Sequence, residues 1–324
     1  MNKLMTGKTF YHYASMRAAA NGDPVMPISC EIDVSNVCNL NCSFCMFEDF
    51  RSRDRSLLDF VLFSSLVFQL RDVGCKSITF TGGGEPTIHP EFNDMAQLAM
   101  QAGFDIGLVT NGTMLKDVKT PQLFKFIRVS LDAGNPATYA ALKGTDKFEK
   151  VLDGMRYAKD RGAFVGASFV VCRENVESMG EAEAVAKELD LEYIQFKPAY
   201  LKGSTGRSGI GYDEYEMPTA ESDVSIIETT RSVAQNNLPC KMAGLVGIVT
   251  ANAEVCFCCQ WRGVHVAGNL HKTTTFRELW LKRHKLQPDI TKCPPCRYMA
   301  YADAYEEFNS QGQCAMFWEH RDFL

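Results

Sequence analysis

The sequence lacks several features that would indicate a membrane protein or a nucleic-acid-binding protein. No apolar run approaches the length of about 18 residues that a bilayer-spanning helix needs. The N-terminal stretch MNKLMTGKTFYHYASMRAAANGDP has no continuous apolar segment of the kind found in secretory signals. Lys and Arg total 34 against 39 Asp and Glu, a net charge of -5, which argues against a nucleic-acid-binding face. These absences predict a cytoplasmic protein.

Sequence repeats and low-complexity tracts are also missing. A chain of 324 residues is long enough for one large domain or two smaller ones, each with a buried core. The composition, 46% hydrophobic and 23% charged, is ordinary for a globular protein.

Cysteine is the residue in excess. The chain has thirteen, and in a reducing compartment clustered cysteines hold metals or do chemistry more often than they form disulfides. Three isolated ones, Cys30, Cys75 and Cys172, are predicted to be small buried hydrophobic residues. The others gather in two groups, Cys38, Cys42 and Cys45 near the start, and Cys240, Cys256, Cys258, Cys259, Cys293, Cys296 and Cys314 in the last quarter.

Short β-branched runs alternate with amphipathic segments through the first two hundred residues. The runs are Ile28–Val34, Ser77–Thr81, Ile106–Thr110, Phe126–Leu131, Ala167–Val171 and Tyr193–Phe196. The amphipathic segments are Leu57–Val73, Glu91–Ala102, Phe148–Arg161 and Ser178–Leu189. This alternation predicts an α/β fold with a parallel sheet covered by helices. Because these strands are too few to close an eight-stranded barrel, we expect an open, partial (β/α)6 TIM-like barrel with its site at the C-terminal edge of the strands.

The alternation stops after Phe196. A glycine-rich loop follows over 197–218, then a predicted helix at Ser222–Gln235 and a cysteine-rich tail with short strands around Gly244–Thr250 and Glu254–Phe257. We therefore expect an N-terminal extension at 1–27, the partial barrel at 28–211, and a small C-terminal domain at 212–324.

The first cysteine group, NVCNLNCSFCM, has the spacing C-x3-C-x2-C and directly follows the first predicted strand. Three thiolates are one fewer than a structural metal site usually has. They can hold three irons of a [4Fe-4S] cluster and leave the fourth iron open for a ligand. A structural zinc site with a distant fourth ligand is the alternative.

The cysteine spacing, with Phe44 just before the third cysteine, resembles the radical S-adenosylmethionine (radical SAM) superfamily. The resemblance implies that S-adenosylmethionine chelates the open iron and is split by one electron. The products would be methionine and a 5′-deoxyadenosyl radical that abstracts hydrogen from substrate. In TFTGGGEPTIHP, Gly83, Gly84 and Glu85 match the family's cofactor-binding GGE motif, since glycine allows close approach and a carboxylate suits an ammonium group.

Two further strand ends carry polar residues. Asn111, in LVTNGT, resembles the family's polar contact to the cofactor, expected at its ribose, although asparagine is also a common turn former. Ser130, in VSLDA, resembles a position that contacts the cofactor's ribose or carboxylate. Asp132 is expected at the same edge or as the cap of the next helix.

From spacing alone, the C-terminal cysteines suit zinc and iron–sulfur equally. GIVTANAEVCFCC and GNLHKTTTFRELW resemble the SPASM/Twitch accessory domains of radical SAM enzymes. Too few cysteines follow the CPPC pair for a full SPASM set, so the resemblance implies the Twitch form with one auxiliary [4Fe-4S] cluster. Its expected ligands are Cys240, Cys258, Cys293 and Cys296. Cys256 or Cys259 is an alternative to Cys258.

The resemblance implies a radical SAM oxidoreductase or epimerase supplied by a flavodoxin- or ferredoxin-type donor. Only about 27 residues precede the first strand, which favours a small polar substrate of the sugar, aminocyclitol or nucleoside type over a peptide. Modification of a ribosomal peptide or protein is the alternative, and a non-catalytic zinc scaffold is a third class. Candidate hydrogen donors or bases are Cys256, Cys259, Cys314, Lys197 and Arg207.

Overall fold

The computed structural model describes residues 11–45, 47–199, 224–227, 242–259, 262–270 and 273–286. Its strands are β1 (Ser29–Asp33), β2 (Ser77–Thr81), β3 (Asp105–Thr110), β4 (Phe126–Ser130), β5 (Val165–Val171), β6 (Tyr193–Pro198), β7 (Ser225–Ile227), β8 (Val246–Val249), β9 (Glu254–Cys256) and β10 (Val266–Asn269). The helices are α1 (Tyr13–Asn21), α2 (Glu48–Arg53), α3 (Phe60–Asp72), α4 (Phe92–Gln101), α5 (Pro136–Lys143), α6 (Phe148–Asp160), α7 (Met179–Glu188) and α8 (Phe276–Arg283).

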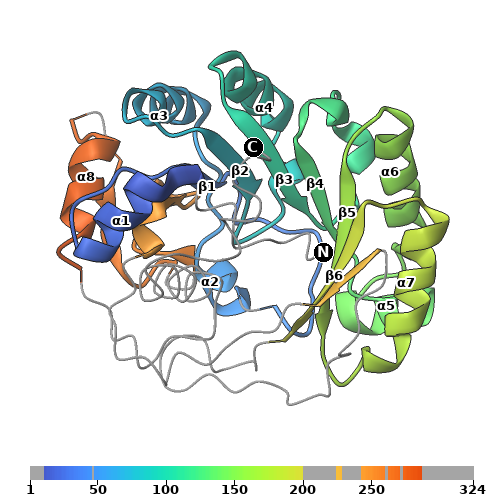
Figure 1. The fold of residues 1–324 in the computed structure, drawn as a ribbon. Helices are drawn as coiled ribbons and strands as arrows, with labels where there is room; N and C mark the ends of the chain where they lie inside the picture. Colours follow the sequence, from blue (N-terminus) through green and yellow to red (C-terminus); the bar gives the residue numbers. More distant parts are fainter. Residues whose placement is uncertain are drawn as a thin grey trace, which may run out of the picture.

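The strands form one sheet in the order β10-β9-β8-β1-β2-β3-β4-β5-β6-β7. Strands β1 to β7 are parallel to their neighbours, and β8 joins the free edge of β1, also in parallel. Strand β9 then runs antiparallel to both of its neighbours, β8 and β10. The sheet is not closed, and helices α3, α4, α6 and α7 lie around its outer side (Figure 1). The expected partial barrel is confirmed.

The two faces of the strands differ in burial. On β4, Ile127 and Val129 are fully buried against the helices, whereas Phe126, Arg128 and Ser130 are half-buried. The same alternation on the other strands places apolar residues in the main core with α3, α4, α6 and α7. The opposite side of β1–β6, which we call the inner face, is mostly polar. Its polar residues include Glu31, Asp33, Thr79, Thr81, Arg128, Ser130, Ser168, Tyr193, Gln195 and Lys197, and its apolar ones include Val109, Phe126 and Val170.

Local sequence signals explain where several elements begin and end. Asn135 caps α5, its side chain accepting a hydrogen bond from Thr138 N at 2.8 Å, and Pro136 takes the first helical position. Gly144 ends this helix with a left-handed φ of 69°. Since Asn135 is the cap, Asp132 does not serve as one. Thr275 begins α8 with a capping box to Glu278.

Most of the predicted elements are present, with a few differences. The six predicted strands and four predicted helices correspond to β1–β6 and to α3, α4, α6 and α7. Within Ser222–Gln235, where a helix is predicted, residues 225–227 form strand β7; the other residues of that segment, except Val224, lie outside the described part. The predicted short strands near 244–257 are β8 and β9. Cys30, Cys75 and Cys172 are buried, as predicted.

The predicted glycine-rich loop lies outside the described residues beyond Ala199. Among the residues that are described, no helix has the length and apolar character needed to cross a bilayer.

Candidate active site at the cysteine loop

The three N-terminal cysteines lie on the loop that leaves the C-terminal end of β1. Cys38, Cys42 and Cys45 are half-buried and are not joined in disulfides. Two backbone hydrogen bonds attach the start of this loop to the loop after β2. Gly84 N donates to Ser35 O at 3.0 Å, and Glu85 N donates to Val37 O at 2.8 Å. The GGGE segment is therefore built against the cysteine loop at the sheet edge.

Close packing explains why glycine occupies position 84. A Cβ atom at Gly84 would lie 2.2 Å from Val37 O, far inside van der Waals contact with backbone. At Gly82 a Cβ would lie 2.9 Å from Ser35 O. The glycines thus allow two loops to touch, in addition to any room they leave for a cofactor.

Glu85 is buried and connects the ends of β2 and β3. Its carboxylate accepts hydrogen bonds from Thr110 Oγ1 at 2.6 Å and from Asn111 N at 2.7 Å. It also accepts from Thr87 Oγ1 at 2.5 Å and Thr87 N at 3.1 Å. Burial raises the pKa of Glu85, and the hydrogen bonds from Asn111, Thr110 and Thr87 oppose that rise. Both carboxylate oxygens therefore have partners within the chain.

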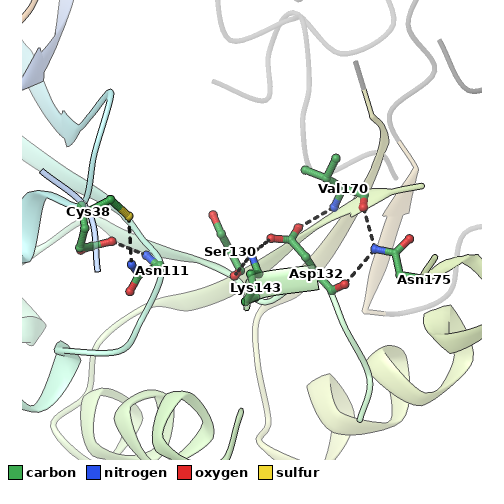
Figure 2. Close-up of polar contacts among 8 residues, drawn as sticks. Cys38, Asn111, Ser130, Asp132, Lys143, Val170 and Asn175 are labelled. Carbon is green, nitrogen blue, oxygen red and sulfur yellow. Dashed lines mark hydrogen bonds and ion pairs between the residues drawn. The ribbon is translucent and has the colours of Figure 1, made fainter. Parts of the chain in front are cut away.

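Asn111, at the end of β3, faces the cysteine loop. Its Nδ2 donates to Asn39 Oδ1 at 2.9 Å and lies 3.9 Å from Cys38 Sγ. Its Oδ1 accepts from Thr113 Oγ1 at 2.7 Å, and Asn39 Nδ2 in turn donates to Thr113 Oγ1 at 2.9 Å. Three side chains thereby form a closed set of hydrogen bonds at the end of β3, and Asn111 links this set to Cys38 (Figure 2).

A buried ion pair lies beside this set, between the end of β4 and the end of α5. Lys143 Nζ pairs with Asp132 Oδ2 and donates to Ser130 O at 3.2 Å (Figure 2). The ammonium also lies 5.1 Å from the ring centroid of Phe44, between the second and third cysteines. Burial lowers the pKa of Lys143, but the negative charges of Asp132 and Cys42 outweigh it and the pKa is raised.

Asp132 is held in an uncommon backbone conformation, with φ at 59°. Its carboxylate accepts from Val170 N at 2.7 Å, and its carbonyl accepts from Asn175 Nδ2 at 2.8 Å (Figure 2). The ends of β4 and β5 are thus joined through one aspartate. Its second carboxylate oxygen is left to hold Lys143 under the cysteine loop.

The surroundings of the three sulfur atoms suit an anionic thiolate cluster. Arg51 Nη2 lies 3.4 Å from Cys45 Sγ, and Lys143 and Asn111 face Cys42 and Cys38. Burial raises the pKa of Cys38, and it raises that of Cys42 to about 11. Because burial alone keeps these thiols neutral, a bound metal is the natural source of the charge that would ionise them.

The geometry of the donor set also bears on its metal. Over the described stretches, no three His, Cys, Asp or Glu side chains are grouped to hold a single metal ion. A [4Fe-4S] cluster distributes its thiolates over separate irons. Cys38, Cys42 and Cys45, with the cations of Arg51 and Lys143 beside them, are the residues that would hold such a cluster.

A second group of charges lies on the inner face at β1, the strand that leads into the cysteine loop. Arg262, just before β10, pairs with Glu31 Oε2 at 2.8 Å and with Asp33 Oδ2 at 3.2 Å, both on β1. Its guanidinium also lies 5.3 Å from the ring centroid of Phe47, next to α2. Asp33 is fully buried, and burial raises its pKa to about 6 although Arg262 acts to lower it. This cluster joins the C-terminal hairpin to the strand that leads into the cysteine loop.

The C-terminal cysteines that the structure describes occupy different surroundings. Cys256 is fully buried on β9 near Arg262, and burial raises its pKa to about 12. Cys258 belongs to an apolar cluster with Met242, and Cys259 packs against the edge of that cluster. Strand β9 ends at Cys256, so strand alternation does not extend to Cys258.

Of the remaining predicted site residues, only Lys197 is described. Lys197 is half-buried on the inner face of β6. Cys240, Cys293, Cys296, Cys314 and Arg207 lie outside the described residues.

Sequence reasoning missed four residues of this site. From the sequence alone, Lys143 would be interpreted as a solvent-exposed lysine and Asn39 as an ordinary loop residue. Thr110 reads as an ordinary strand residue. Arg262 is 229 positions from Asp33 in the chain, so its pairing carries no local signal.

The structure is a partial parallel barrel with three cysteines on the loop after its first strand, at the carboxyl edge of the sheet. Residues 32–184 match the family described as Radical SAM superfamily. The chain therefore carries a radical SAM domain, running from the end of β1 into α7, and the resemblance inferred from the cysteine spacing is confirmed.

Two named proteins are similar in sequence to this chain. A "Probable GTP 3',8-cyclase" of Saccharolobus islandicus (strain M.14.25 / Kamchatka #1) is 28% identical over 268 residues, covering 76% of this chain and 82% of that protein. A "Tungsten-containing aldehyde ferredoxin oxidoreductase cofactor-modifying protein" of Pyrococcus furiosus is 28% identical over 162 residues, covering 46% of this chain and 45% of that one.

Among solved structures, Streptococcus suis SuiB bound to precursor peptide SuiA has a TM-score of 0.64 and 16% identity, covering 84% of this chain and 68% of that one. The anSMEcpe structure with bound AdoMet has a TM-score of 0.57 and 15% identity, covering 88% and 98%. At these identities the two structures share the fold with this chain.

Proposed function

We propose that this protein is a radical SAM enzyme that abstracts hydrogen from a small polar substrate of the sugar, aminocyclitol or nucleoside type, leading to its oxidation or epimerisation. The observation that carries this proposal is the polar inner face beneath the cysteine loop. A packed barrel core would present branched apolar side chains there. Instead, half-buried Thr79 and Thr81 face inward from β2 and half-buried Arg128 and Ser130 from β4, with Val109 of β3 between them. Such a surface suits a substrate with several hydrogen-bonding groups.

A cluster on Cys38, Cys42 and Cys45 would supply one electron to S-adenosylmethionine, giving methionine and the 5′-deoxyadenosyl radical. The chain's own residues prepare the place for this chemistry. Asn111 and Asn39 fix the position of Cys38, and Lys143 supports Phe44 between the other two cysteines. The proposed contacts to the cofactor are Gly83, Gly84, Glu85, Asn111 and Ser130.

The named relatives support a nucleoside- or nucleotide-type substrate, since several of them are called GTP 3',8-cyclases and match across most of their length. Peptide modification has less behind it, because the structures solved with peptides share only the fold with this chain. We further propose one auxiliary [4Fe-4S] cluster on the C-terminal cysteines and a flavodoxin- or ferredoxin-type electron donor.

Iron content and cofactor cleavage test the proposal together. After anaerobic reconstitution we expect about eight irons per chain, from two four-iron clusters. With dithionite and S-adenosylmethionine, the protein should form 5′-deoxyadenosine. The triple variant Cys38→Ala, Cys42→Ala, Cys45→Ala should keep about four irons and form no 5′-deoxyadenosine. Dithionite-dependent 5′-deoxyadenosine from this variant would show that the first cluster lies elsewhere.

A further inference from the structure

The inner face of the sheet carries an arginine without an acidic partner in the described part of the chain. Arg128 lies in the middle of β4 and is half-buried. Its Nε is buried without a hydrogen-bond partner, and its Nη1 makes a long contact of 3.5 Å to Gln195 Oε1. No salt bridge within the described ranges reaches its guanidinium.

The acidic residues of the inner face do not neutralise this charge, because they are engaged elsewhere. Glu31 and Asp33 on β1 both pair with Arg262, at 2.8 and 3.2 Å. Lys143 similarly has Asp132. Buried charges in proteins are normally paired, because removing an unpaired ion from water is costly. Arg128 departs from this pattern among the described residues.

Arg128 has an apolar neighbour on one side and neutral polar residues on the other. On β3 its register partner is Val109, and on β5 it is Gly166, whose missing side chain leaves room for the ring of Tyr193. Two residues nearer the carboxyl edge of the sheet, Ser130, Ser168 and Gln195 are register partners across β4, β5 and β6. The contact with Gln195 shows that the guanidinium leans toward that polar row.

We propose that Arg128 is the anion-binding residue of the substrate site, and that the substrate carries a phosphate or a carboxylate which it binds. This inference rests on the proposed function, because it places a substrate on the inner face below the cysteine loop. The planar guanidinium matches both anions through paired N–H donors, and Ser130, Ser168 and Gln195 supply further polar partners. With the anion held in the middle of β4, the rest of the substrate extends toward the carboxyl edge, where the cysteine loop lies.

The test uses inorganic phosphate and acetate as probes, at equal ionic strength against chloride, with the anaerobically reconstituted protein and no S-adenosylmethionine. An anion that binds the folded state raises the thermal midpoint in proportion to its occupancy. We expect at least one of the two probes to raise the midpoint of the wild type. Arg128→Gln should weaken the apparent affinity for that anion about tenfold or more. Arg128→Lys should restore part of it, because it keeps the charge but not the fork.

Arg156→Gln is the matched control, since Arg156 is a half-buried arginine on α6 that pairs with Asp153 and Glu188, and its loss should leave the anion response unchanged. Circular dichroism checks that each variant is folded, and the Lys variant keeps the test valid if the Gln variant does not fold. The inference is overturned if neither anion shifts the wild type, or if Arg128→Gln and wild type respond alike. A response to phosphate alone or acetate alone assigns the class of anion.

Formation of 5′-deoxyadenosine by the wild type is measured separately. If 5′-deoxyadenosine forms but no anion effect is seen, the anion site fails and the proposed function stands. If no 5′-deoxyadenosine forms from the reconstituted wild type, the proposed function itself fails, whatever the anions do.

Discussion

Lys143 and Asp132 form a buried ion pair that joins the end of α5 to the end of β4, directly beneath the cysteine loop. The side chains are 2% and 1% exposed, so neither charge has water as an alternative partner. The loop is attached to the same helix end by backbone, since Ser43 N donates to Leu142 O at 2.9 Å. The ion pair therefore lies at the helix end that also anchors the cysteine loop.

Replacing one partner of this pair should be strongly destabilising. Lys143→Met leaves the buried carboxylate of Asp132 without its cation, which costs about 3–5 kcal/mol in comparable cases. The free energy of unfolding of the cluster-free protein, from urea denaturation, measures this. Lys116→Met is the control, because Lys116 and Asp153 are about half exposed and such pairs contribute about 0–1 kcal/mol. Equal losses in the two variants would contradict the role given to Lys143.

A second replacement separates the pair's charge from its packing. Asp132→Asn combined with Lys143→Met removes both charges, so the double variant should be more stable than Lys143→Met alone. If the double variant loses the sum of the two single losses, the residues are not energetically coupled.

The cost of a side chain at Gly84 follows from its contact with the cysteine loop. Gly84→Ala would place Cβ 2.2 Å from Val37 O, so one of the two loops must move. We expect the reconstituted variant to lose most of the iron of the first cluster while keeping its secondary structure. Gly180→Ala, on α7, is the control, because nothing lies within 4 Å of the added methyl group. Full iron content in Gly84→Ala would show that this contact does not position the cysteines.

Much of this fold follows from local sequence signals, and much of the site does not. The β-branched runs indicate β1–β6 because buried parallel strands need continuous apolar residues. The cysteine spacing and the GGGE segment locate the site because both follow predicted strands. The pairing of β8 with β1 has no such local signal, nor does the ion pair of Arg262 with Asp33, because both join residues more than two hundred positions apart.

The same limit applies to single residues. Helix α5 is short and its amphipathic pattern is weak, so the sequence predicts neither the helix nor the role of Lys143 at its end. The sequence allows Asp132 as a helix cap because aspartate commonly fills that position. The fold uses Asn135 there, and Asp132 instead joins two strands and a lysine. Such choices depend on which groups the folded chain brings together.

The raised pKa of Asp33 predicts a pH dependence of stability. Burial raises this pKa to about 6, above its ordinary value, so the folded protein holds the proton more tightly than the unfolded chain. The contribution of Asp33 to stability is then complete below pH of about 4 and is lost as the pH rises through about 6. A shift of about two units corresponds to about 3 kcal/mol.

Asp33→Asn removes this titration. The unfolding free energy of wild type minus that of Asp33→Asn should therefore fall by about 3 kcal/mol between pH of about 4 and 7. Asp153→Asn is the control with the opposite sign, because a hydrogen bond and the charge of Lys116 lower the pKa of Asp153. A difference curve for Asp33→Asn that rises with pH would contradict the assignment.

The choice among the C-terminal cysteines can be settled by iron content in a background without the first cluster. Cys258 lies in an apolar cluster with Met242, and Met242 is two positions from Cys240 in the sequence. Cys256 instead lies on β9 near Arg262 and Asp33. We therefore expect Cys258, with Cys240, to ligate the proposed auxiliary cluster.

In the triple variant that lacks Cys38, Cys42 and Cys45, adding Cys258→Ala should reduce the iron from about four per chain to about none. Adding Cys256→Ala should leave about four, because a thiol within the strand is not a ligand. Cys259→Ala is the closer control, since Cys259 packs against the same apolar cluster as Cys258 but is more exposed. If Cys259→Ala abolishes the remaining iron and Cys258→Ala does not, Cys259 is the ligand, and the turn after β9 presents its second thiol rather than its first.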